Sequence, residues 1–188
     1  MIEADDILHI ELTPEDRDLI KLKAGLIAEK KYNTEYGEGS PYRPASAEAL
    51  AKRWLSGLAG EYAMEKYFGC KIIDLATLSR PDLSPIGYWL GVKTSYEDNP
   101  NIIVSESFNS AQVICLLERD LSFVSVLGIA DMQLLCEALA DEASTLPSTI
   151  KSPVKKFRLP PEYFSRLDKF TPEELSKYKV AENWHTNN

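Results

Sequence analysis

The spacing of apolar residues changes once along the chain, close to Gly69. Before this point apolar residues recur every three or four positions, which is typical of one face of a helix. After it, short apolar and β-branched runs are separated by polar residues, which is typical of strands. The pattern therefore predicts helices first and a sheet afterwards.

Two helices are predicted before Gly69. The first begins at Thr13, whose hydroxyl can cap it ahead of Pro14 and two acidic residues, and runs to about Lys31. A loop over 33–45 follows. Ser46 then caps a second helix, which ends near Phe68, with one stripe of apolar residues: Leu50, Trp54, Leu58 and Tyr62.

The rest of the chain predicts a sheet, a helix and a helical tail. Asp131 can cap a helix that runs to about 142, and two short helices are expected over 161–168 and 172–178. The order predicts an α/β fold with a central, mixed, four- to five-stranded sheet flanked by helices. The expected strands are 70–78, 87–95, 102–104, 111–117 and 123–129.

Length and composition favour one compact domain. The chain has 188 residues, of which 44% are hydrophobic and 27% charged. Neither a membrane span nor a secretory signal is apparent, so a soluble cytoplasmic protein is expected. Three widely spaced cysteines favour reduced core thiols, and two histidines at opposite ends argue against histidine-based metal sites or Ser-His catalysis.

Charge is unevenly distributed along the chain. The net charge is −8, but residues 151–188 carry +3, which leaves −11 for residues 1–150. An acidic surface repels phosphate backbones unless a cation or a basic patch mediates the contact. The tail offers a patch of this kind, although a solvated, mixed-charge terminus is the simpler interpretation. Its basic residues are Lys151, Lys155, Lys156 and Arg158.

Three charged residues stand out as candidates for chemistry. Glu61 lies on the apolar side of the second helix, Asp82 lies in a turn, and Lys93 interrupts an otherwise uncharged strand. A lysine within a buried strand is costly unless it is paired or solvated. Two carboxylates that converge on a lysine can provide oxygen ligands for a divalent metal and a positive charge that orients an attacking water.

At these residues the sequence resembles the PD-(D/E)XK nuclease superfamily, which has the restriction-endonuclease-like fold. Pro81-Asp82 resembles the PD half of the motif, and Gly91-Val92-Lys93 stands where the second half belongs. Gly60-Glu61 resembles the helical glutamate of the family. The resemblance divides the chain into a nuclease-like core over 46–142, an N-terminal helix and loop over 1–45 packed on it, and a helical tail over 143–188 of the same domain.

The sequence departs from the family at Gly91, where the family has an acid. Glu61 is the first candidate to replace the missing carboxylate, with Glu97 and Glu106 as further candidates. The resemblance implies that Glu61, Asp82 and the Val92 carbonyl hold Mg²⁺ or Mn²⁺. It also implies that Lys93 positions the water that attacks a DNA phosphodiester. Phosphate contacts are expected from Ser95, Lys155 and Lys156.

Each candidate residue also has a purely structural interpretation. Glu61 can be a surface glutamate, Asp82 a turn former, and Lys93 a charge that protects an edge strand from aggregation. The resemblance favours a metal-dependent nuclease that acts on DNA. The alternative is a catalytically silent protein of the same fold, whose acidic surface binds a basic protein partner as a mimic of nucleic acid.

Overall fold

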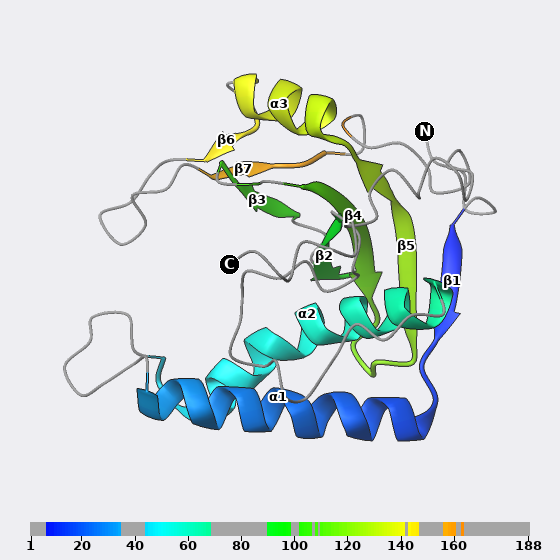
Figure 1. Cartoon of the computed structure of the whole chain (residues 1–188), viewed down its shortest axis with the longest axis vertical. Coiled ribbons are helices and arrows are strands. Elements are labelled where there is room, and N and C mark those ends of the chain that lie inside the picture. Colours follow the sequence, from blue (N-terminus) through cyan, green and yellow to red (C-terminus); the bar gives the residue numbers. More distant parts are fainter. Residues whose placement is uncertain are drawn as a thin grey trace, which may run out of the picture.

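The protein is an α/β protein with a mixed four-stranded sheet, helices packed on it, and a small antiparallel sheet (Figure 1). The computed structural model describes residues 7–34, 44–68, 90–98, 102–106, 108, 110–141, 143–146, 156–160 and 163. The helices are α1 (Pro14–Thr34), α2 (Ala47–Phe68) and α3 (Met132–Ala140). The strands are β1 (Leu8–Glu11), β2 (Leu90–Tyr96), β3 (Ile103–Ser105), β4 (Ala111–Leu117), β5 (Phe123–Ala130), β6 (Thr145–Leu146) and β7 (Lys156–Arg158).

The main sheet has the strand order β1-β5-β4-β2. Strands β2 and β4 are parallel, whereas β4 pairs antiparallel with β5, and β5 pairs antiparallel with β1. The register places Gly91 opposite Gln112 and Lys93 opposite Ile114. The small sheet has the antiparallel order β3-β7-β6.

The helices begin where the sequence predicts. Thr13 caps α1: its Oγ1 accepts a hydrogen bond from the backbone of Asp16, whose carboxylate accepts one from the Thr13 backbone. Ser46 and Asp131 cap α2 and α3 through the backbone N–H three residues further along. The predicted end of α2 at Phe68 is confirmed, while α1 continues three residues beyond Lys31.

The main sheet has an apolar cluster on each of its two faces. Helix α2 packs directly on the sheet, and α1 covers the outer side of α2 (Figure 1). The cluster beneath these helices includes Leu58 and Met64 of α2 and Val113 of β4, with Trp54 and Tyr62 packed against it. The second cluster joins the opposite face to α3 and the small sheet through residues such as Ile114, Leu135 and Phe157.

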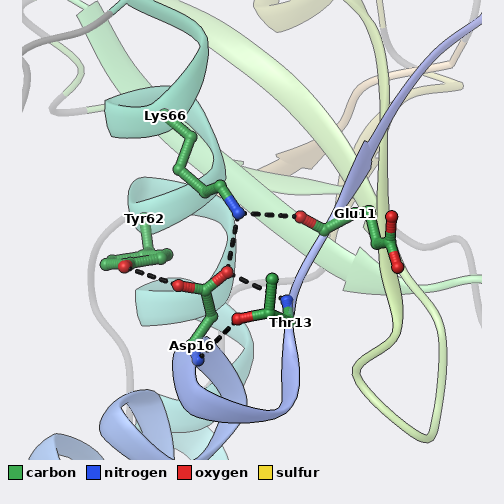
Figure 2. Close-up of polar contacts among 5 residues, drawn as sticks. All are labelled: Glu11, Thr13, Asp16, Tyr62 and Lys66. Atoms are coloured by element: carbon green, nitrogen blue, oxygen red, sulfur yellow. Dashed lines mark hydrogen bonds and ion pairs between the residues drawn. The ribbon is translucent and has the colours of Figure 1, made fainter.

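A polar network fixes α2 to the start of α1 (Figure 2). The Asp16 carboxylate accepts hydrogen bonds from the Tyr62 hydroxyl at 2.7 Å and from the Lys66 ammonium at 2.6 Å. The Lys66 ammonium also donates to the backbone oxygen of Glu11 at 3.1 Å. The network therefore connects β1, α1 and α2, and it sets the position of the helix that carries Glu61.

Parts of the predicted order differ from the structure. Strand β1 was not predicted, and β3 lies in the small sheet rather than the main one. The tail over 143–188 was expected to be helical, but its described part contains β6 and β7. The strand expected over 70–78 and the helices expected over 161–168 and 172–178 lie outside the described residues, apart from Tyr163 in a short 3₁₀ turn.

Two further findings concern membrane-spanning helices and the positions of the cysteines. No helix among the described residues is both long enough and apolar enough to cross a membrane. Cys115 is a buried core residue as expected, and burial raises the pKa of its thiol to about 12. Cys136 is exposed on α3, so the expectation of a core position was wrong for this cysteine.

Candidate functional site

Helix α2 and strand β2 touch at Gly60. A Cβ atom at this position would overlap the Thr94 hydroxyl and lie 3.1 Å from Cγ1 of Val92. Glycine is therefore the residue that allows this close approach. The Thr94 hydroxyl is itself buried and has no hydrogen-bond partner in the described structure.

The contact brings Glu61 and Lys93 into electrostatic interaction. Both side chains are partly buried, Glu61 next to Gly60 on α2 and Lys93 in the middle of β2. Burial raises the pKa of the Glu61 carboxyl to about 7, and the positive charge of Lys93 opposes that rise. Burial likewise lowers the pKa of Lys93, and the negative charge of Glu61 opposes the decrease.

Strand β2 presents its side chains alternately to two faces of the sheet. Val92 and Thr94 face α2, so Gly91, Lys93 and Ser95 lie on the opposite face. Strand β2 is the outermost strand of the described sheet on this side. At this edge of the sheet, therefore, no other described strand lies between α2 and the face of β2 that carries Lys93.

The space beside Gly91 is filled by the side chain of Gln112 on β4. A Cβ atom at Gly91 would overlap Oε1 of Gln112 and lie 2.6 Å from Nε2 and 2.8 Å from Cδ. The amide nitrogen of Gln112 donates to the Ser110 carbonyl oxygen at 2.8 Å and lies 3.2 Å from the Ser110 hydroxyl. Because a carbonyl oxygen can only accept, this contact fixes which end of the amide is the nitrogen.

The structure brings together only some of the predicted site residues. Glu61 and Lys93 interact, and Ser95 lies on the same face of β2 as Lys93. Val92 is in the same strand, paired with Val113. Asp82 and Lys155 lie outside the described residues.

Three other candidates lie on exposed positions elsewhere. Lys156 is exposed on β7, with Ser105 as its partner in the small sheet. Glu106 is exposed just after β3. Glu97 is exposed just after β2, where its carboxylate accepts a 3.2 Å hydrogen bond from the Ser125 hydroxyl.

Two polar features on the Lys93 face were not predicted from the sequence. One is Gln112, which the apolar run over 111–117 conceals because a single amide does not change the strand pattern. The other is the Ser125 hydroxyl, which lies 2.9 Å from Nδ1 of His9 and also bonds Glu97. This contact depends on the pairing of β1 with β5, and β1 is too short for its residue pattern to predict a strand.

Comparison with other proteins adds no assignment. No protein-family model matches the chain, and no curated protein and no solved structure matches it either. Among the described residues, no group of three or more His, Cys, Asp or Glu side chains converges as a metal site. The Glu61–Lys93 pair and the adjoining Gly91–Gln112 contact are thus the features on which a function can be argued.

Proposed function

We propose that the protein is a metal-dependent nuclease of the restriction-endonuclease-like fold, which hydrolyses DNA phosphodiester bonds. The observation that carries the proposal is the interaction between Glu61 and Lys93. An acid and a base from different elements are partly buried together beside a glycine that lets those elements touch. Shifted pKa values of this kind, with a charged partner, are more frequent at functional sites than elsewhere.

The donor atoms suit a small divalent cation. Glu61 and Asp82 would provide carboxylate oxygens and Val92 a backbone carbonyl oxygen, and Mg²⁺ and Mn²⁺ prefer oxygen ligands. A bound cation would also favour the charged form of Glu61, whose pKa burial has raised to about 7. When bound, the cation would polarise a phosphoryl oxygen and neutralise developing negative charge.

Lys93 has the clearest role among the described residues. Its ammonium would hold the attacking water by a hydrogen bond and attract the phosphate of the substrate. Because burial lowers its pKa, the group gives up a proton more readily than an exposed lysine does. Ser95, on the same face, would contact a neighbouring phosphate, and Lys155 and Lys156 would help an acidic chain to retain DNA.

A cleavage assay tests this proposal. The full chain is incubated with linear, circular and single-stranded DNA in the presence of Mg²⁺ or Mn²⁺, and Lys93→Met is compared with Lys30→Met. Lys30 is exposed on α1, so its substitution controls for loss of one positive charge. We expect metal-dependent cleavage that Lys93→Met abolishes and Lys30→Met retains. Activity that survives Lys93→Met would reject the mechanism.

A second function is favoured by one observation. The amide of Gln112 occupies the space beside Gly91, so the strand position at which the family has an acid is closed to a side chain. A silent protein of this fold that binds a basic protein partner through its acidic surface would have this feature. Absence of cleavage on every DNA substrate, together with unchanged stability in Mg²⁺ and Mn²⁺, would favour this function over the nuclease.

A further inference from the structure

Helix α1 carries two large apolar side chains that lie open to solvent. Leu22 is 61% exposed and Leu26 is 48% exposed, and the two are one turn apart on the same side of the helix. Among the described residues, no other helix or strand has two large apolar side chains this exposed. Helix α1 forms the outer layer of the molecule, since its other side packs on α2 (Figure 1). Single exposed apolar side chains are normal, whereas adjoining ones are typical of a surface that binds a partner.

Gly25 lies beside these leucines, and no packing within the described structure accounts for it. The residue is exposed in the middle of the helix, and a Cβ added there would meet no atom of the described chain within 4 Å. Glycine destabilises a helix interior relative to alanine, so the single chain gains nothing from it. At Gly60 the same residue type lets α2 approach β2. A glycine on the outer face of α1 would likewise let a second backbone approach closely.

The charges around Gly25 indicate which partner fits this face. Lys21 and Glu29 are exposed and lie four residues before and after Gly25, so the three residues form one row along the helix. If a second copy packs antiparallel, with a two-fold axis at Gly25, Lys21 of each copy lies level with Glu29 of the other. A parallel pair would instead place Lys21 against Lys21 and Glu29 against Glu29, and like charges repel. The row is therefore complementary to itself in the antiparallel arrangement.

We propose that the protein forms a homodimer through α1, in which the α1 helices of two copies pack antiparallel across Gly25. Leu22 of each copy then lies about 3 Å along the helix axis from Leu26 of the other, so the exposed leucines cover each other. Two Lys21–Glu29 ion pairs flank this apolar contact. The proposal does not depend on the nuclease activity, because α1 lies on the side of α2 that faces away from the sheet (Figure 1).

Sedimentation velocity of the full chain over a range of concentrations tests the dimer. We expect wild type to change from monomer to dimer as its concentration rises. Leu22→Gln should raise the dissociation constant of the dimer by about tenfold or more, whereas Met132→Gln, which replaces an exposed apolar side chain of α3, should not. Gly25→Ala should also weaken the dimer while making the dilute monomer more resistant to heat, a combination that damage to the fold would not give.

Reversal of charges tests the antiparallel register. Lys21→Glu and Glu29→Lys should each weaken the homodimer, since each variant places like charges opposite each other at both contacts. A mixture of the two variants should form a heterodimer, because both of its contacts pair Glu with Lys, and the double variant should dimerise like wild type. A wild-type chain that stays monomeric at its highest soluble concentration would leave the α1 face to a different partner and would overturn the proposal. So would a dimer that Leu22→Gln does not weaken, or single reversals whose mixture regains no association.

Discussion

The hydroxyl of Tyr62 donates a 2.7 Å hydrogen bond to the carboxylate of Asp16, which lies 46 positions earlier in the chain. This bond joins two helices whose other contacts are mainly apolar. It also shifts the pKa values of both side chains. Hydrogen bonding to Asp16 is the main reason why the pKa of Tyr62 is raised to about 12. The position of α2, and with it that of Glu61, therefore depends on a residue in the first turn of α1.

Tyr62→Phe should destabilise the protein without changing its fold. The substitution removes the hydroxyl and retains the ring that packs against the apolar cluster. A hydrogen bond to a charged group contributes about 1.5–3 kcal/mol to the free energy of unfolding. Urea denaturation of Tyr62→Phe, Asp16→Asn and the double variant measures the coupling. Purely additive effects would contradict the proposed link between the helices.

Asp16 should make the protein sensitive to acid. Burial of its carboxyl raises the pKa, but hydrogen bonds from Lys66, Tyr62 and Thr13 outweigh this effect and lower the pKa from 3.8 to about 2. The resulting stabilisation is present above pH 4 and is lost as the pH falls through 2. It amounts to at most about 2 kcal/mol. Between pH 2 and 5 the free energy of unfolding should fall more in wild type than in Asp16→Asn, which retains only the acid sensitivity of other carboxyl groups such as Asp120 and Asp141.

Glu61 should make the stability of the protein depend on pH in the opposite direction, and near neutral pH. Its folded-state pKa of about 7 exceeds the ordinary value of 4.5, so the folded state retains a proton that the unfolded state releases. Stability should therefore decrease as the pH rises from about 4.5 to above 7, by up to about 3 kcal/mol. Glu61→Gln should remove this decrease, while Glu29→Gln, an exposed variant on α1, should retain it. A decrease that persists in Glu61→Gln would show that another group is responsible.

Two glycines of α2 should respond differently to alanine. Gly60→Ala places a methyl group against Thr94 and Val92, and overpacking of this kind costs about 1–3 kcal/mol. At Gly57 nothing lies within 4 Å of the added atom, so Gly57→Ala should stabilise the helix by up to about 1 kcal/mol. Thermal unfolding of the two variants measures the difference. Equal effects would show that α2 and β2 are not held in contact at Gly60.

The predicted elements were most reliable where local chemistry determines them. The caps at Thr13, Ser46 and Asp131 are confirmed because each depends on a hydrogen bond within three residues. The strand predicted over 111–117 is confirmed with the same bounds, since a run of buried apolar residues marks it. These features can be read from a few consecutive residues.

Features that depend on distant pairing could not be predicted in the same way. Strand β1 has four residues and is defined by its pairing with β5, and β7 pairs not only with the preceding β6 but also with β3, which lies far from it in sequence. The sequence singled out Glu61 and Lys93 because each is a charged residue in an apolar stretch, whereas the place of Gln112 beside Gly91 follows from the parallel register of β2 and β4. Asp82 remains a prediction, as it lies outside the described residues.

The pairing of β1 with β5 has a consequence for synthesis on the ribosome. His9 is matched with Ser125, so the first strand of the chain must wait until more than a hundred further residues have emerged before it can join the sheet. Pairing over such separations slows folding and leaves a strand without its partner. Throughout that interval the adjacent α1 and α2 can already pair with each other, because their contacts need only the first 68 residues. The helical hairpin is thus the part of the molecule able to form while translation is still under way.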